Sequence, residues 1–103
     1  MNIVLVYSTL PDKPAAEKFQ RELVEGKLAG CVNIFPINSC YEWRGLVENE
    51  QEWVILAKTL PSHTKKVCEH ITKNHPYDTP CILTWKTQAN NAYIEWMESF
   101  ILQ

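Results

Sequence analysis

The stretch from Cys31 to Thr59 constrains the fold of this chain more than any other part of its sequence. It contains two extended apolar runs, Cys31–Trp43 and Trp53–Lys58, which a polar segment, Arg44–Glu52, joins. β-Branched and aromatic residues fill both runs, and the apolar positions do not repeat at helical spacing. The pattern therefore predicts a long β-hairpin, whose first arm exceeds the roughly five to six residues of a usual strand.

A hairpin of this length extends beyond the body of a small domain. Pro36 and the pair Asn38–Ser39 interrupt its first arm, and they predict a bend or a bulge there. Backbone groups near the tip have no neighbouring strand within one copy, and such groups recruit a strand from another chain. We therefore expect this hairpin to build an oligomer.

Length and composition indicate one domain, residues 1–103, with a thin core. A chain of this size buries only about 60–70% of its unfolded surface, so contacts between subunits would add stability. The net charge of −2 and the scattered basic residues argue against nucleic-acid binding. No apolar run approaches the ~20 residues of a membrane span. Four cysteines without a C-x-x-C pair favour a reduced, cytoplasmic compartment.

The remaining segments predict the order of the elements. Ile3–Tyr7 has the pattern of a central strand, and Asp12 is the expected N-cap of the first helix. A second helix follows the N-cap Ser62, and Cys81–Trp85 is predicted as the last core strand. A final helix aligns Tyr93, Trp96 or Met97, Phe100 and Ile101. This order predicts an α+β fold of the ferredoxin-like βαββαβ type with one helix added.

Such a fold leaves one face of its antiparallel sheet without a helix. Two helices cover the first face, so the second face meets solvent or a partner. We assign Trp43, Trp53 and Ile55 to this second face, and their apolar character favours a partner.

The segment His75–Pro80 is the most constrained loop of the sequence. Each proline restricts the residue before it to an extended backbone, so His75, Tyr77 and Asp78 are held in fixed directions. Imidazole and carboxylate groups suit divalent transition metals, which makes a metal or ligand site one interpretation. The other interpretation, which the residue pattern alone favours, is a rigid connector whose side chains cap backbone groups.

Other candidate residues lie in or beside the hairpin. Cys40 occupies the irregular middle of the first arm and is the cysteine to test for metal binding or oxidation, although packing is the simpler interpretation. Glu48, Glu50 and Glu52 alternate and project to one side, either to bind a hard cation weakly or, as favoured, to block unwanted strand addition. Lys58 lies at the predicted end of a strand, where it is expected either to contact an anion or to be solvated. No nucleophile–base pair is evident, so nothing demands an enzyme.

Four motifs together resemble the CutA divalent-cation tolerance family. They are CVNIFP at 31–36, YEWRG at 41–45, an E-x-x-x-x-x-K pattern ending at Lys58, and HPYDTP at 75–80. The closing Tyr93-x-x-Trp96 fits as well, and the resemblance covers essentially the whole chain. The combination of HPYDTP with YEWRG at this distance is specific to the family.

The resemblance implies a cytoplasmic homotrimer whose hairpins pair across subunits and form an inter-subunit sheet. The family is associated with tolerance to copper and other divalent metals, and some members bind copper. Those members use a cysteine in the first strand and two histidines before Pro-Tyr. The matching positions here hold Ser8, Asn74 and His75, so only His75 is in place. The architecture is also similar to that of PII signalling proteins, whose ligands lie between subunits.

Three hypotheses follow. The first is a non-enzymatic homotrimer for tolerance to divalent metals, holding Cu(II) or another divalent cation at His75, Asp78 and Cys40. Trimer formation is expected to bring the loop residues, Tyr77 included, near a ligand cleft formed by Tyr41, Trp43 and Lys58 of a neighbour. The second hypothesis, from fold-level analogy, is a PII-like signalling trimer that binds a small anionic metabolite between subunits. The third is a structural trimer without a small ligand.

Overall fold

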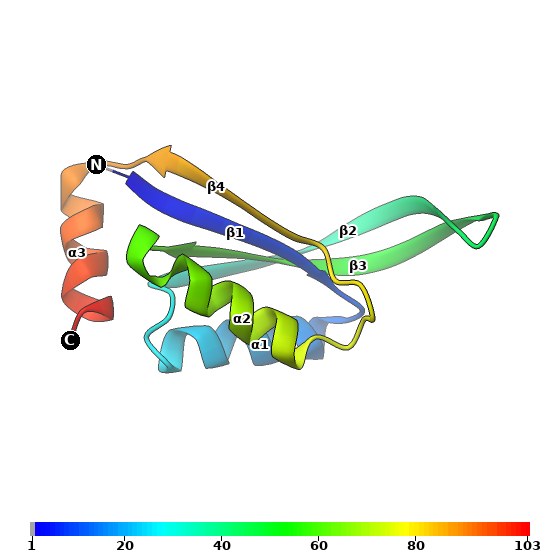
Figure 1. Cartoon of the computed structure of the whole chain (residues 1–103), viewed down its shortest axis with the longest axis horizontal. Coiled ribbons are helices and arrows are strands. Elements are labelled where there is room, and N and C mark those ends of the chain that lie inside the picture. The colour runs from blue at the N-terminus through cyan, green and yellow to red at the C-terminus, as the bar shows by residue number, and fades with distance from the viewer. Residues whose placement is uncertain (1) are drawn as a thin grey trace.

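The computed structural model describes residues 2–103. The elements follow in the order β1 (Asn2–Leu10), α1 (Lys13–Glu25), β2 (Cys31–Trp43), β3 (Leu46–Thr59), the 3-10 helix η1 (Pro61–His63), α2 (Thr64–Asn74), β4 (Ile82–Gln88) and α3 (Asn91–Ile101). The strands form one antiparallel sheet in the order β2-β3-β1-β4 (Figure 1). The predicted α+β, ferredoxin-like fold with an added C-terminal helix is confirmed.

The helices α1 and α2 cover one face of this sheet (Figure 1). Asp12 begins α1 as predicted, because its side-chain oxygen accepts a hydrogen bond from the Ala15 N–H at 2.9 Å. The helix then buries the face that carries Phe19 and Leu23, and α2 adds Val67 and Ile71. These residues pack on Val4, Val6, Leu10, Val32, Ile55 and Ala57 of the strands.

The assignment of Trp53 and Ile55 to the uncovered face was wrong. Ile55 lies opposite Ser8 and is fully buried among the helix-facing residues, and Trp53 packs against the same cluster. Residues 53–57 are all apolar, so the sequence shows no alternation from which the inward side could be chosen. The pairing register decides the side, and it turns the odd-numbered residues of β3 toward the helices.

The uncovered side of the sheet, called the open face below, is nevertheless apolar. Leu5 lies opposite Trp85 in the register, and Tyr7 lies between Leu83 and Leu56. Side chains remain accessible here, with Leu83 51% and Trp85 44% exposed. The last strand predicted at Cys81–Trp85 exists as β4, which runs from Ile82 to Gln88. Its assignment to the core was wrong, because β4 lies along an edge of the sheet and most of its residues are exposed.

The hairpin of β2 and β3 extends beyond the rest of the sheet (Figure 1). Pairing with β1 ends at Trp53, so Leu46–Glu52 of β3 pairs only with Ile37–Trp43 of β2. We call this two-stranded part the ribbon. It gives the molecule extents of 47 × 24 × 21 Å and a radius of gyration of 14.5 Å. A compact chain of about 100 residues has a radius of gyration near 13 Å.

The hairpin turn is tighter than predicted. Arg44 and Gly45 form a two-residue connection with φ values of 53° and 83°, the left-handed pair of a type I′ turn. The prediction of Arg44–Glu52 as a polar connecting segment was thus wrong, because β3 begins at Leu46. Residues of the ribbon lack a helix on either side, so polar side chains are tolerated on both of its faces and hide the strand pattern.

The first arm contains no bulge. The register from Cys31 opposite Lys58 to Trp43 opposite Leu46 proceeds one residue at a time without an offset. Pro36 fits into this ladder because β2 is an edge strand, where a missing N–H need not remove a bond between strands. Of the predicted bend or bulge at Asn38–Ser39, the bulge is therefore absent.

The C-terminal helix α3 closes one end of the sheet (Figure 1). Its buried residues Ile94, Met97 and Ile101 pack on Ile3 and Leu60. Met97, rather than Trp96, takes the inward position. Ser62 lies inside η1, so the predicted N-cap of the second helix was misplaced. Among residues 2–103, no helix combines the length and the apolar content that crossing a bilayer requires.

Candidate functional site

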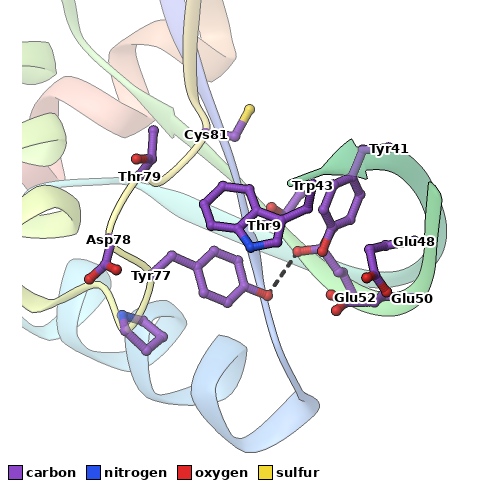
Figure 2. A pocket seen from close by; sticks show the side chains of 11 residues that line it. Thr9, Tyr41, Trp43, Glu48, Glu50, Glu52, Tyr77, Asp78, Thr79 and Cys81 are labelled. Carbon is purple, nitrogen blue, oxygen red and sulfur yellow. Dashed lines mark hydrogen bonds between the residues drawn. The ribbon is translucent and has the colours of Figure 1, made fainter. Parts of the chain in front are cut away.

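A cleft of about 710 Å³ lies between the ribbon and the connection from α2 to β4. We call it the ribbon cleft, and Figure 2 shows the side chains around it. Its lining comes from β1, the ribbon and the proline-rich loop: Thr9, Tyr41, Trp43, Glu48, Glu50, Glu52, Pro76, Tyr77, Asp78, Thr79 and Cys81. Segments that are far apart in the sequence therefore meet here, as expected at a binding site.

His75 stands behind this cleft with both ring nitrogens engaged. Its Nδ1 accepts a hydrogen bond from the Tyr77 N–H at 3.0 Å, so the ring proton must be on Nε2. That proton is donated to the Thr9 carbonyl oxygen at 2.8 Å. Burial lowers the pKa of His75, an effect that the Thr9 carbonyl and the Glu52 charge oppose only in part. The ring is therefore a neutral cross-link between the loop and β1.

This cross-link positions Tyr77. The ring centroids of His75 and Tyr77 are 4.8 Å apart, and the Tyr77 hydroxyl donates to the Glu52 carboxylate at 2.9 Å (Figure 2). Burial raises the pKa of Tyr77, and the hydrogen bond to Glu52 and the nearby carboxylate charges raise it further. Tyr77 thus stays protonated and serves as a hydrogen-bond donor that ties the loop to the ribbon.

Glu48, Glu50 and Glu52 share one face of the ribbon, as their alternation predicts. They lie on the side that also carries Tyr41, since Glu48 is directly opposite Tyr41 in the register. A hydrogen bond to Glu50 raises the pKa of Tyr41, and so do the charges of the neighbouring glutamates. Glu52 is 7% exposed although it is a carboxylate. No Lys, Arg or His is part of the lining, so the ribbon cleft is an acidic site.

The other predicted site residues are distributed unevenly. Asp78 lines the cleft but lies across the Tyr77 ring from the ribbon glutamates (Figure 2). Cys40 lies opposite Asn49 on the reverse face of the ribbon, and Lys58 lies opposite Leu5 with its Nζ 5.8 Å from the centre of the Tyr93 ring. Tyr41, Trp43, Tyr77 and Asp78 therefore meet within one chain, whereas Cys40 and Lys58 lie elsewhere.

A preformed metal centre is not found in the described part of the chain. Within residues 2–103, no group of three or more His, Cys, Asp or Glu is arranged to hold an ion. Ser8, at the first-strand position, is fully buried on the helix-covered face. Asn74 donates its side-chain N–H to the His70 carbonyl at 2.9 Å. Neither position therefore offers a ligand beside His75.

Two residues that matter to the site were missed from the sequence. Glu52 was grouped with its exposed neighbours, although it is the buried acceptor for Tyr77. Thr9 was not considered, although its carbonyl holds His75. Glu52 did carry a signal, since it directly precedes the apolar run that enters the body of the sheet. A backbone carbonyl such as that of Thr9 leaves no mark in a sequence.

Comparison with known proteins shows which family has this sequence and fold. A family model described as CutA1 divalent ion tolerance protein matches residues 4–99. The divalent-cation tolerance protein CutA of Thermotoga maritima is 37% identical over 101 residues, which are 97% of this chain and 100% of that protein. The chloroplastic protein CutA of Arabidopsis thaliana is 38% identical over 98 residues, 93% of this chain but 54% of the plant protein. This chain thus spans about half the length of that relative.

Solved structures agree with these sequence matches. The divalent ion tolerance protein CutA1 of Ehrlichia chaffeensis superposes with a TM-score of 0.93 at 37% identity, covering 97% of this chain and 95% of that one. The periplasmic divalent cation tolerance protein CutA of Archaeoglobus fulgidus gives a TM-score of 0.92 at 32% identity, with 96% and 98% covered. The chain described here belongs to the CutA1 divalent ion tolerance protein family.

Proposed function

We propose that this protein is a non-enzymatic divalent-cation tolerance protein that acts as a homotrimer, with residues 1–103 working as one domain. The names of its relatives, divalent-cation tolerance proteins, support the role. The observation that supports a binding site is the acidic ribbon cleft. Its lining includes four carboxylates and no basic side chain. Such a cleft concentrates cations near its surface.

The trimer is proposed from the open face and the ribbon. Leu83 and Trp85 expose apolar surface on a sheet face that no helix of the described chain covers, and the ribbon leaves backbone groups unpaired along its outer edges. A closed three-fold arrangement would cover these surfaces without forming an open-ended polymer. The exposed surface on one copy is thus explained by what the neighbouring copies cover.

The acidic cleft is proposed as a weak cation site. Carboxylate oxygens are the ligands that hard divalent cations take, but Asp78 and the ribbon glutamates do not converge on one point. A Cu(II) ion that uses His75 must take its Nδ1 lone pair from the Tyr77 N–H. This competition predicts low affinity for copper at His75 and Asp78. Cys40, on the reverse face of the ribbon, would bind a metal independently of this loop.

The anionic-metabolite alternative finds no support in this cleft. Four carboxylates would repel an anion, and Lys58, the basic residue that the sequence suggested for the ligand, lies away from the lining. We therefore propose a cation as the ligand.

We propose a cytoplasmic location, because all four cysteines are free. Relatives are described as chloroplastic in Arabidopsis thaliana and as periplasmic in Archaeoglobus fulgidus, so the compartment differs within the family. Cell fractionation followed by immunoblotting tests the location, and recovery with the periplasmic or organellar fraction would contradict it.

Titration calorimetry with CuCl2 and with MnCl2 tests the metal role. Glu50→Gln removes a carboxylate from the cleft, whereas Glu42→Gln removes one from the reverse face of the ribbon and is the matched control for net charge. We expect Glu50→Gln and His75→Ala to weaken binding of at least one ion while Glu42→Gln leaves it unchanged. Equal affinities in all three variants would remove the metal role from this cleft.

A further inference from the structure

The ribbon leaves the body of the molecule as an arm that no other layer supports. Pairing between β3 and β1 ends at Trp53, and beyond this residue β3 pairs only with β2 (Figure 1). A two-stranded hairpin is marginally stable by itself, and two-stranded ribbons twist more than larger sheets do. The direction of the ribbon relative to the body therefore depends on contacts at its base.

Two contacts meet the base of the ribbon from opposite sides of the sheet. On the open face, the Tyr77 hydroxyl donates to the carboxylate of Glu52, the ribbon residue next to the end of the pairing with β1, at 2.9 Å (Figure 2). On the helix-covered face, the Lys13 Nζ lies 5.5 Å from the centre of the Trp53 ring. Successive residues of a strand point to opposite faces, so the proline-rich loop and α1 contact the base from two sides.

The contact at Glu52 is the directional one, because a hydrogen bond weakens steeply as its angle departs from linearity. Glu52 is 7% exposed, and a buried carboxylate is costly unless hydrogen bonds compensate for its lost hydration. Within residues 2–103, no other side-chain hydrogen bond and no ion pair joins the ribbon to another part of the chain. A ribbon that swings away from the loop therefore loses this bond.

We propose that Tyr77 is a strut that holds the ribbon in one direction and thereby prepares it to associate with neighbouring copies. Behind the strut, His75 accepts from the Tyr77 N–H at 3.0 Å and donates to the Thr9 carbonyl at 2.8 Å, so the strut is anchored on β1. The strut itself lies within one chain, whereas its effect on association rests on the trimer proposed above.

A ribbon that is held in advance should favour association through all three copies at once. An arm that adopts the required direction only part of the time lowers the apparent affinity by that fraction. If loss of the strut left each ribbon correctly directed about a third of the time, the association constant of three copies would fall about 27-fold. The concentration at which half of the protein is assembled would rise about fivefold, because that constant scales with the square of the concentration.

Sedimentation velocity over a dilution series of the full chain tests the effect on assembly, with one low urea concentration for all variants to bring the midpoint into range. We expect Tyr77→Phe, which removes the hydroxyl and keeps the ring, to raise the half-assembly concentration about fivefold or more. Tyr41→Phe is the matched control, since it removes a hydroxyl bonded to Glu50 within the ribbon. Thr59→Val removes a buried hydroxyl bond in the body and controls for a general loss of stability. Both controls should assemble as the wild type does.

A double variant tests whether Tyr77 acts through Glu52. Glu52→Leu removes the acceptor and the buried charge, and a replacement of this kind is often neutral or favourable for stability. It should weaken assembly as Tyr77→Phe does while the free energy of unfolding is retained. Residues that act through one contact are non-additive, so the double variant should assemble no worse than the weaker single variant. Additive losses would overturn the strut.

The motion of the ribbon is measured through a nitroxide label at Cys40, which is exposed on its reverse face. The other three cysteines are replaced by alanine. Electron paramagnetic resonance spectra are recorded for the assembled protein and for a Leu83→Asp background, in which a charge on the open face should release the neighbouring copies. We expect Tyr77→Phe to increase the mobility of the label in at least one of these samples, and Tyr41→Phe in neither.

The outcomes separate this inference from the proposed trimer. Unchanged label mobility in Tyr77→Phe would overturn the strut, and greater mobility with unchanged assembly would overturn its role in association. A wild-type protein that is monomeric at every concentration would contradict the trimer, and the label would still decide whether Tyr77 holds the ribbon.

Discussion

The two faces of the sheet both carry apolar residues, but they differ in how far those residues are buried. On the helix-covered face, Val6 and Ile55 are fully buried beneath α1 and α2. On the open face, Leu83 and Trp85 are nearly as apolar, yet about half of each side chain is exposed. Burial of apolar surface is the main favourable term in folding. The covered face therefore explains why one chain folds, and the open face is the surface through which we propose that copies associate.

The adjacent residues Ile55 and Leu56 offer the sharpest test of this difference, because they point to opposite faces. Ile55→Ala opens a cavity beneath the helices and should lower the free energy of unfolding by about 2–5 kcal/mol, measured by urea denaturation. Leu56→Ala should cost less within one chain, since Leu56 is only partly buried. Equal losses that do not depend on protein concentration would remove the distinction between the faces.

A charge on the open face should act on assembly. Leu83→Asp places a carboxylate in the apolar surface that neighbouring copies are proposed to cover, where an unpaired charge costs several kcal/mol. Thr84→Asp, one residue along β4 on the opposite side, is the control. Sedimentation velocity should show a smaller species for Leu83→Asp alone. Unchanged sedimentation of both variants would argue that the open face is not the contact surface.

Substitution of the buried hydroxyls on the covered face should change the free energy of unfolding by a smaller amount. Thr59 donates to the Leu28 carbonyl at 2.6 Å, so Thr59→Val should lower the free energy of unfolding by about 1–2 kcal/mol. The Ser8 hydroxyl is buried with no hydrogen-bond partner within residues 2–103, so Ser8→Ala should leave stability unchanged or raise it by up to about 1 kcal/mol. Thermal and urea unfolding measure both, and a destabilised Ser8→Ala protein would reveal an unrecognised bond.

The pH dependence of stability tests the cross-link at the ribbon cleft. Burial lowers the pKa of His75 in the folded protein, so below about pH 6.5 the unfolded chain binds the proton more readily. Stability should therefore fall as the pH decreases from 7 through that range, because protonated Nδ1 can no longer accept from the Tyr77 N–H. His75→Gln should show a shallower slope in urea midpoints between pH 5 and 7 than His63→Gln does. Identical slopes would contradict the neutral cross-link.

Much of the covered face could be predicted from the sequence. The helix cap at Asp12 and the helical spacing of Phe19 and Leu23 are local patterns, and the structure confirms them. The face to which Ile55 belongs could not be predicted, because it depends on a strand partner at Ser8 that lies far away in the chain. Local patterns therefore identified the elements, and pairing between distant strands decided their orientation.

The candidate site was predicted less completely for a related reason. The prolines that flank His75–Pro80 indicated a rigid loop, and Tyr77 and Asp78 do line the ribbon cleft. The use of both His75 nitrogens depends on the Thr9 carbonyl and on the fold of the loop itself. Lys58 was grouped with the cleft because it closes a family motif, but its distance from the cleft is set by its position along β3.

The mass of the purified protein in solution tests the central claim most directly. Multi-angle light scattering at micromolar concentration should report three copies of the 12.0 kDa chain, a mass of about 36 kDa. Leu83 and Trp85 would then be covered by neighbouring copies. A well-folded species of 12.0 kDa under the same conditions would contradict the account, because its open face and ribbon would remain uncovered.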